Sequence, residues 1–532
     1  MSDLLSIGST SVRAYQTALN VVGENIANAN TQGYVRREAQ LTEISGGAGR
    51  YILLSNLTVG SGVAANTVGR NWDAFRAADL RNATAESGRT GSTIVWLERV
   101  ENTLNTAGIS AAMTKFFNAG QAIAADPTGS APRTGFLDAA YGVSAAFSTT
   151  SDGLAAIDSD LRASAKLAVD QLNGLANGLA EANAGLVKAR DGSNEQAQLM
   201  DQRDRLIDQI SQLASISVAT DERGVATVKL NDASGPTLVN GTATKPLDVA
   251  FNASGAMALT LDPNGTAEDV PLKGGSLAGF MEAATRVSDL RLRVTNLAQS
   301  LADGVNQVQA AGVDLDGQPG AALFDASSGD GKIAVNTLSV RQIAAARPWT
   351  VGATAGNTGV ATLQVQTNGA PLGQTRISIS GGVLTATDPV TNSVIGTAPY
   401  TPGTPVTLAG LDITVTGAAS DGDSFTVSAT KPGSRDNGNL QLLDQLRKSG
   451  QFESTSNEMV SSNASALSAK RQVADAQNAI LEGASAARDA VTGVNLDQEA
   501  VDLMRFQQAY QASSRIIQVS RDIFQSILDA VQ

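Results

Sequence analysis

The chain of 532 residues contains no cysteine and no histidine. Without thiols it can form neither disulfides nor thiolate nucleophiles, and without imidazole it loses the Ser-His-Asp relay and nearly every type of zinc site. An enzyme of this composition would have to use carboxylate, lysine, tyrosine or serine side chains. Aromatic residues make up only 4% of the chain, which favours thin helical packing and small β units over one large aromatic core.

Positive charge and long apolar runs are also scarce. Lysine and arginine number 38 against 51 acidic residues, a formal net charge of -13. Nucleic-acid binding needs clustered basic residues, which are missing here, so we expect no nucleic-acid partner. No apolar run approaches the roughly 20 residues of a membrane-spanning helix, and residues 1–16 lack the basic and apolar segments of a cleavable signal peptide. We therefore expect no membrane partner and, if the protein is exported, no cleaved signal.

Both ends of the chain carry apolar residues at every seventh position. The first set is Leu5, Val12, Leu19 and Ile26, and the second is Leu496, Leu503, Tyr510, Ile517 and Phe524, assisted by Phe506 and Leu528. This period is typical of coiled coils and predicts two terminal helices, the second beginning near Asn495, that pair side by side. Periodicity does not name the partner of a stripe, so an ordinary antiparallel pair that closes a globular domain explains the pattern equally well.

Between the ends, the hydrophobic period changes several times. Residues 71–216 show helical spacing, and residues 217–272 and 351–429 alternate with period two between Gly, Asn and Pro bends, which predicts two β insertions. A helix is predicted over 274–312, with Ser276 as its N-cap and Gly312 as its stop. Helical spacing resumes at Leu440 and continues to the end of the sequence. We expect breaks in it at the flexible segment 454–465 and at Gly493.

The fold class that follows is mainly α with inserted β domains: terminal coiled-coil helices, a helical bundle or stalk, and two β-rich insertions. A chain of 532 residues is also too long for one ordinary core. We assign residues 1–45 and 490–532 to a terminal coiled-coil domain and residues 46–216, 273–348 and 433–489 to a mainly helical domain. Residues 217–272 form a small β insertion, and residues 349–432 form an outer β domain.

An amide-rich segment ends the first predicted helix. Asn25, Asn28 and Asn30, with Thr31, Gln32 and Gly33, occupy positions where the helical spacing stops. Asn and Gly tolerate the left-handed conformation, so we expect them to end the helix and to direct residues 34–41 outward. Because a helix stop needs only one such residue, the segment is either a capped turn or a hydrogen-bonding joint between neighbouring subunits.

Other candidate sites have simpler explanations. The segments 314–320 and 327–335 resemble calcium loops, but neither supplies alternating oxygen ligands with a closing Glu, so both are expected to be turns. Asp201, Asp204 and Asp208 share a predicted helix with Arg203 and Arg205, and ion pairs one turn apart on a solvated face would account for them. We therefore expect no catalytic residue, metal or cofactor.

Several motifs resemble those of a known family. "ALNVVGENIANANTQGYVRR" resembles the N-terminal signature of flagellar rod, hook and hook-associated axial proteins, in which an Asn-rich helix end runs into Thr-x-Gly-aromatic. The matching positions include Asn25, Ile26, Asn28, Asn30, Thr31, Gly33 and Tyr34. "GVNLDQE" followed by "LMRFQQAYQAS", together with the internal "LMDQRDRLIDQIS" and "GGSLAGFMEA", narrows the resemblance to the hook-associated protein 1 family. It touches residues 1–45, 195–215, 272–325 and 490–532 and leaves the β insertions largely unmatched.

The resemblance implies a structural protein of the bacterial flagellum, outside the cell, that joins hook to filament as a ring assembled through its terminal helices. The implied partners are further copies of the chain, the hook protein, a second junction protein on the filament side and an export chaperone that binds the C-terminal helix. The assembly interface would comprise both apolar stripes with Phe506 and Leu528, and Asn25, Asn28, Asn30, Thr31, Gly33 and Tyr34. The alternatives are a hook or rod subunit and, from another class, a secreted carboxylate hydrolase or adhesin.

Overall fold

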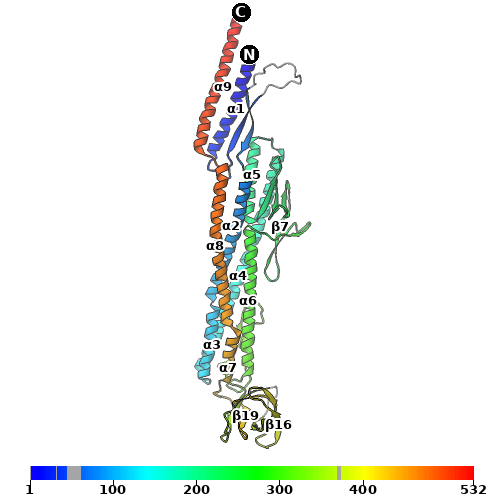
Figure 1. The fold of residues 1–532 in the computed structure, drawn as a ribbon, viewed down its shortest axis with the longest axis vertical. Helices are drawn as coiled ribbons and strands as arrows, with labels where there is room; N and C mark the ends of the chain where they lie inside the picture. Colours follow the sequence, from blue (N-terminus) through cyan, green and yellow to red (C-terminus); the bar gives the residue numbers. More distant parts are fainter. Residues whose placement is uncertain (1, 32, 45–61, 368–372, 532) are drawn as a thin grey trace. The chain divides into compact units, whose positions relative to one another are not determined.

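A computed structural model describes residues 2–31, 33–44, 62–367 and 373–531 (Figure 1). Gln32 of the amide-rich segment lies outside the described residues. The chain divides into two compact units, each built from separate stretches of sequence. Unit 1 comprises Met1–Glu98, Asp158–Arg286 and Ala466–Gln532, and unit 2 comprises Arg99–Ile157 and Val287–Ser465. The boundaries fall inside four long helices: α2 (Ala74–Ala107), α4 (Ser130–Lys188), α6 (Ser276–Ala311) and α8 (Phe452–Thr492).

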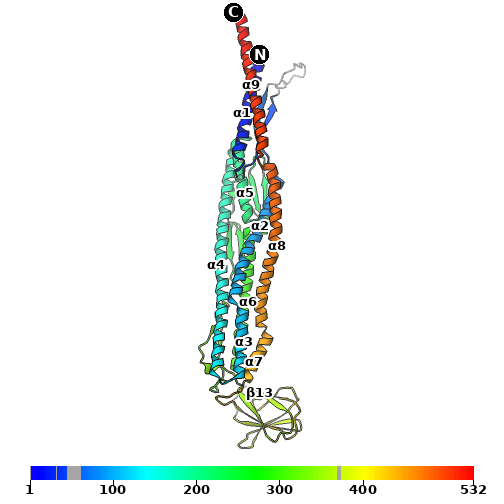
Figure 2. The ribbon, with the colours of Figure 1, turned by 90° about the vertical axis from the view of Figure 1, so that its left-hand side faces the viewer.

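The terminal helices of unit 1 pair with each other. α1 (Ser2–Ala27) and α9 (Leu496–Val531) lie side by side in both ribbon views (Figure 2). A β-hairpin of β1 (Arg37–Glu43) and β2 (Val63–Arg70) packs against α1. The helices run antiparallel, because Tyr15 contacts Phe506 near the middle of the pair while Asn25 meets Glu499 at its end. Both predicted terminal helices are therefore confirmed, as is the break at Gly493, which lies between α8 and α9.

The rest of unit 1 combines long helices with small sheets. α5 (Asn194–Leu213) begins at the N-cap Ser193, whose hydroxyl accepts a hydrogen bond from the backbone N–H of Gln196. The strands that follow are β3 (Ile216–Thr220), β4 (Ala226–Leu230), β5 (Thr237–Asn240) and β6 (Ala243–Thr244) in one sheet, and β7 (Leu247–Phe251), β8 (Met257–Leu261) and β9 (Glu268–Asp269) in another. The first predicted β insertion is confirmed.

α6 begins differently from the prediction. Ser276 is its first helical residue rather than its N-cap, and its buried hydroxyl has no hydrogen-bond partner. The turn into the helix depends instead on Gly275, which has a φ of 85° and donates its N–H to the carbonyl of Ala85. A Cβ at this position would lie 2.3 Å from the backbone of Leu213, so the chain needs glycine here for both conformation and space.

Unit 2 contains the remaining helices, α3 (Ile109–Ala125) and α7 (Gly438–Gly450), together with β10 (Phe324–Asp325), β11 (Ala334–Val335) and a 3-10 turn at Val340–Gln342. The predicted break at 454–465 is wrong, because α8 is continuous through it. Helical spacing places Phe452, Ser456, Met459, Asn463 and Leu467 on one face of α8, and all five are buried. Burial of this face outweighs the weak helix propensity of the Ser- and Asn-rich sequence.

The second β insertion lies within unit 2 and has its own core. Its strands are β12 (Trp349–Ala353), β13 (Thr362–Thr367), β14 (Thr375–Ser380), β15 (Val383–Thr387), β16 (Val394–Pro399), β17 (Val406–Leu408), β18 (Leu411–Thr416) and β19 (Ser424–Ala429). They form two sheets, ordered β12-β19-β14-β15-β16 and β13-β18-β17. One cluster of buried apolar residues, all from 349–427, fills the space between them. The two ends of this β insertion meet where Trp349 of β12 pairs with Ala429 of β19.

Candidate functional site

The seam between α1 and α9 combines small and polar side chains with a few large ones. On α1, Gly8, Ser11 and Ala18 are buried. A Cβ added to Gly8 would lie 2.7 Å from the side chain of Ile517, so glycine lets the two helices approach closely. Tyr15 and Phe506 contact each other with ring centroids 6.4 Å apart. The helices therefore pair through close backbone approach rather than through a continuous row of large residues.

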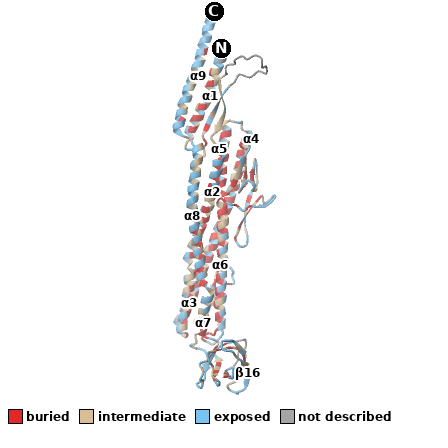
Figure 3. Ribbon diagram, in the orientation of Figure 1, coloured by how far each residue is buried: buried red, intermediate tan, exposed pale blue. Residues whose placement is uncertain are grey.

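The buried positions of α9 also recur every seven residues, but apart from Phe506 they are not the predicted positions. Glu499, Ser513 and Ser520 are buried, and Phe506, which completes the series, is half-buried. The predicted stripes lie beside this seam. Leu5 and Phe524 are 46% and 57% exposed, and Ile26, Leu496 and Leu528 are also exposed. The half-buried members are Val12, Leu19, Leu503, Tyr510 and Ile517. Many of these large apolar residues thus leave part of their surface open, and α9 is coloured as exposed over most of its length (Figure 3).

Asn25 joins three segments at the base of the helix pair. Its Nδ2 donates to the backbone carbonyl of Arg37 at 2.8 Å and to Oε2 of Glu499 at 2.9 Å. Its Oδ1 accepts from the backbone N–H of Arg37 at 3.0 Å and from the hydroxyl of Tyr34 at 2.8 Å. These bonds satisfy the full capacity of a buried amide. Asn25 therefore connects α1 to the start of β1 and to α9 within one chain.

Arg36 and Arg37, adjacent in sequence, pair with different elements. Nε of Arg36 lies 2.6 Å from the Glu499 carboxylate on α9. Arg37 binds Glu24 of α1 at 3.0 Å and Asp201 of α5 at 2.8 Å. The prediction that residues 34–41 point outward is therefore wrong, since the Arg37 side chain is almost completely buried. Charge-assisted bonds to both sides hold this segment between the terminal helices and α5.

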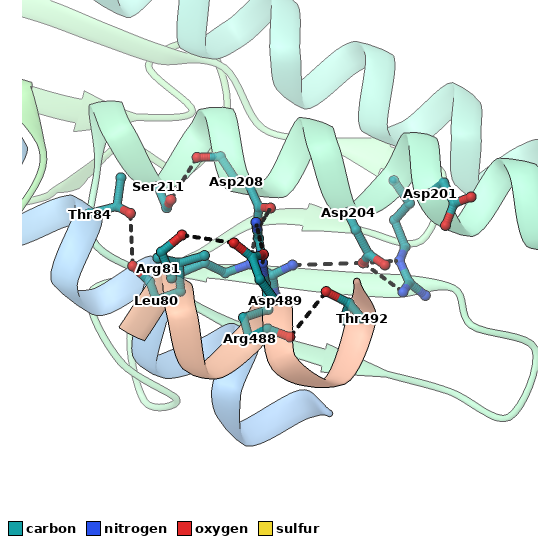
Figure 4. Close-up of polar contacts among 12 residues, drawn as sticks. Leu80, Arg81, Thr84, Asp201, Asp204, Asp208, Ser211, Arg488, Asp489 and Thr492 are labelled. Atoms are coloured by element: carbon teal, nitrogen blue, oxygen red, sulfur yellow. Dashed lines mark hydrogen bonds and ion pairs between the residues drawn. The ribbon is translucent and has the colours of Figure 1, made fainter. Parts of the chain in front are cut away.

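The three α5 carboxylates lie at the centre of the same cluster (Figure 4). Arg70 Nη2 lies 2.7 Å from Asp201 and 2.8 Å from Asp204. Arg81 pairs with Asp208 at 2.7 Å. The predicted pairing one turn apart on a solvated face is wrong, because Asp201 and Asp204 are buried and their partners come largely from other elements. Their spacing of three and four residues places them on one face of α5, and that face points inward.

Burial also shifts the ionisation of this cluster. It raises the pKa of the Asp201 carboxyl group, against the opposing effect of Arg70 and Arg37. Burial likewise raises the pKa of Asp208, and it raises the pKa of Tyr34 to about 12. Ion pairing therefore stabilises the charged groups of this buried cluster. Removing one partner of a pair would leave the other charge buried and uncompensated.

The rest of the amide-rich segment is a turn. Asn28 donates to the carbonyl of Glu24 at 2.9 Å and accepts from the Thr31 hydroxyl at 3.2 Å. Gly33 has a φ of 76°, and a Cβ there would lie 2.6 Å from the side chain of Arg205. Asn30 and Thr31 are exposed and line a cavity of about 380 Å³. Within the described chain, then, Asn25, Asn28 and Thr31 make internal hydrogen bonds, while Asn30 and Thr31 are exposed at the surface of the turn.

The described residues offer little for metal binding. No group of three or more acidic residues in them is arranged to hold a metal ion. Asp314, in the calcium-like segment, accepts the backbone N–H groups of Asp316 and Gln318 at 2.8 Å each, as in a turn. In the same part of the chain, none of the helices has the length and apolarity needed to cross a membrane.

Family models match both ends and the middle of the chain. The Flagellar hook-associated protein FlgK helical domain matches residues 97–324. The Flagellar basal body rod FlgEFG protein C-terminal model matches residues 490–530, and the Flagella basal body rod protein model matches residues 7–34. The two terminal matches contain most of α1 and α9, so these two segments are similar in sequence to flagellar rod proteins.

Relatives of the whole chain carry one name. Flagellar hook-associated protein 1 of Escherichia coli K12 is 26% identical, with 99% of this chain and 100% of the relative covered. The protein of the same name from Bacillus subtilis 168 is 24% identical over 61% of this chain and 70% of its own length. The solved flagellar hook junction protein FlgK from Burkholderia pseudomallei shares the fold, with a TM-score of 0.67 at 19% identity over 78% of this chain and 100% of that one. The chain is therefore similar to flagellar hook-associated protein 1 along almost its whole length, and to its FlgK helical domain and FlgK fold.

Proposed function

We propose that this protein joins the flagellar hook to the filament by assembling into a ring through α1 and α9. The observation that carries the proposal is the unburied apolar surface of this helix pair. Leu5, Ile26, Leu496, Phe524 and Leu528 are all exposed in the isolated chain. A helix with apolar residues on several faces is normally enclosed by neighbours, and contiguous exposed apolar surface marks an interaction site. Neighbouring copies of the same pair would supply that enclosure.

The small-residue seam supports the same proposal. Because Gly8 lets α9 approach α1 closely, large residues such as Leu5 and Phe524 can stay exposed and available for contacts between chains. Each large residue that becomes fully packed in the ring would contribute about 2 to 5 kcal/mol against truncation to Ala. The same contact repeats at every subunit interface of a closed ring, so one substitution weakens the whole assembly.

The ion-pair cluster would anchor the ring-forming helices. Arg36 and Arg37 connect α9 and α1 to α5, whose carboxylates hold Arg70 and Arg81 in turn. Force on the terminal pair would pass into α5 and α2 through these buried contacts. We further propose that Asn30 and Thr31, with their exposed polar groups, contact a neighbouring subunit at the same level.

The proposed partners follow from the position between hook and filament. They are the hook protein on one side, a second junction protein on the filament side, and an export chaperone that covers α9 before assembly. We place the protein outside the cell, as part of the flagellum, and propose that it arrives without a cleavable signal peptide. We propose a structural role without catalysis, cofactor, nucleic acid or membrane contact.

The test is electron microscopy of cells that lack the gene, combined with an assay for filament protein in the medium. Hooks without filaments, with filament subunits leaking out, are the expected result. Absent hooks would assign the chain to the hook or rod instead, and normal flagella would refute the proposal. A chain lacking residues 495–532 should fold in its remaining parts yet fail to restore filaments, and its incorporation into flagella would contradict the role of α9.

A further inference from the structure

The C-terminal half of α8 packs differently from its N-terminal half. Phe452 begins a buried face that continues through Met459 to Leu467. Beyond Leu467, none of the described residues 468–491 is buried, although all of them belong to the helix. A helix at the surface of a protein normally buries one apolar stripe. This half of α8 therefore keeps open a surface that the other half closes.

Polar contacts attach this half of α8 to α2. At one end, the side chain of Gln477 donates to the Glu86 carboxylate at 3.4 Å. At the other end, Nη1 of Arg76 donates to the backbone carbonyl of Ala487 at 3.0 Å. Hydrogen bonds therefore join the two helices on both sides of a stretch in which apolar side chains stay uncovered.

A groove of about 770 Å³ lies between these two contacts. We call it the α2/α8 groove, since α2 lines it within residues 73–86 and α8 lines it within residues 477–487. It follows the helices for roughly 15 Å, the rise of ten residues. Phe75 of α2 and Ile480 of α8 are 83% and 62% exposed there. Large apolar and aromatic side chains that gather at the surface mark an interaction site.

The less exposed apolar residues of the groove are alanines. Ala83 is buried, and Ala484 and Ala487 are half-buried. Because their side chains are short, the two helices leave room between them. The groove can therefore accept larger aliphatic side chains of a partner, with Phe75 and Ile480 packed beside them.

Acidic residues outnumber basic ones around the groove. Its charged residues are Asp73, Asp79, Glu86 and Arg76. Arg76 lies 3.5 Å from Asp73, and Glu86 lies 2.8 Å from Arg89. Asp79 is exposed and has no ion-pair partner among the described residues. The groove thus offers one free carboxylate beside its apolar side chains.

We propose that the α2/α8 groove binds an amphipathic helix of another protein, with aliphatic side chains on one face and lysine or arginine beside them. The aliphatic side chains cover Phe75 and Ile480, and a basic side chain pairs with Asp79. Helices that bind in grooves present their apolar anchors at spacings of three and four residues. A groove of this length takes about three helical turns.

Charge favours a basic partner over a second copy of the chain. The chain has a formal net charge of -13, so a second copy brings charge of the same sign to an acidic groove, and such contacts are unfavourable. The inference goes beyond the proposed ring, because the groove belongs to α2 and α8 rather than to α1 and α9.

Fluorescence anisotropy with the full-length chain tests the proposal. The probe is a labelled helical peptide of leucine and lysine with its leucines on one face, about 18 residues long so that it forms a helix and spans the groove. A matched peptide carries glutamate in place of each lysine. Phe75→Ser and Asp79→Asn should each weaken binding of the lysine peptide about tenfold. Leu167→Ser and Glu181→Gln are the controls, because both residues are exposed on α4 and neither lines the groove.

Each outcome supports or overturns the inference. Binding of the lysine peptide that both groove variants weaken and both controls leave unchanged supports it, provided that circular dichroism shows all four variants folded. Absence of binding, equal binding of the glutamate peptide, or equal loss in the controls overturns it. Self-association of the unsubstituted chain in sedimentation experiments that Phe75→Ser abolishes would assign the groove to a second copy, and it also overturns the inference. None of these results bears on the ring proposal, which is tested in whole cells.

Discussion

Replacing Glu499 with Gln should loosen the terminal helix pair without unfolding the rest of unit 1. The Glu499 side chain is fully buried and accepts from Arg36 at 2.6 Å and from Asn25 at 2.9 Å. Glu499→Gln keeps the shape but leaves the Arg36 guanidinium with only Asp502, at 3.5 Å. Breaking a buried ion pair by removing one partner costs about 3 to 5 kcal/mol. We expect a value near the lower figure, because glutamine can still accept from Asn25.

Amide hydrogen exchange resolved along the chain would measure the change. A loss of about 3 kcal/mol in opening free energy corresponds to roughly a hundredfold faster exchange. The increase should appear in α1 and α9, while α5 and α4 keep their protection. Asp497→Asn is the matched control, since it removes the same charge from the same turn of α9 at an exposed position, where a charge contributes only about 0.3 to 1 kcal/mol.

Two results would refute the reasoning. Equal exchange in the Glu499→Gln and Asp497→Asn proteins would show that the buried pair does not hold α9. Uniform loss of protection across unit 1 would show that the cluster is part of one cooperative core rather than an anchor for the terminal helices. A double-mutant cycle with Arg36→Gln separates the pair from its surroundings, and the coupling should exceed about 1 kcal/mol.

Three further predictions test other parts of the structure. Gly8→Val should destabilise the α1/α9 pair by about 1 to 3 kcal/mol through overpacking against Ile517, as measured by urea unfolding, while Gly23→Ala, with nothing within 4 Å, should be neutral or stabilising. Replacing residues 349–430 with a short Gly-Ser linker should leave the helical part folded, because the excised domain holds its own core and its ends meet at Trp349 and Ala429; loss of the helical circular dichroism signal would contradict this. The pKa of Tyr34 is about 12 in the folded chain, against 10.0 for an unburied tyrosine. The contribution of Tyr34 to folding stability should therefore be complete below pH 10 and be lost as the pH rises toward 12. Tyr34→Phe should remove that slope and lower stability at neutral pH by about 1 kcal/mol, and an unchanged slope in pH-dependent urea unfolding would argue against the Tyr34 assignment.

The terminal helices were predictable because their signals are local. A seven-residue period and a glycine between α8 and α9 define where they run. The residues that join them were not predictable in the same way. A search for large apolar residues selects Leu5 and Phe524, whereas close packing at the seam favours Gly8 and Ser513. Small residues give a weak periodic signal, although they determine how closely two helices approach.

The ion-pair cluster was missed for a different reason. Arg70, Arg81 and Arg37 are separated from their α5 partners by 134, 127 and 164 positions. A sequence pattern along one helix cannot show such distant partners. The acidic residues of α5 were therefore predicted to pair only with arginines of the same helix. One sequence feature did indicate that these carboxylates point inward. They share a face of α5 with the apolar residues Ile207 and Ile210, which are buried.

The antiparallel seam links residues that are made at very different times. Asn25 binds Glu499 across 474 positions of sequence, and ribosomes and export channels handle a chain from its N-terminus onward. α1 therefore cannot pair with α9 until nearly five hundred further residues have been made. A chain cut short before α9 leaves α1 unpaired, with Asn25 and Arg36 lacking their Glu499 partner. We expect such a product to be more open to proteolysis than the full chain, so pairing of the two ends distinguishes finished chains from fragments.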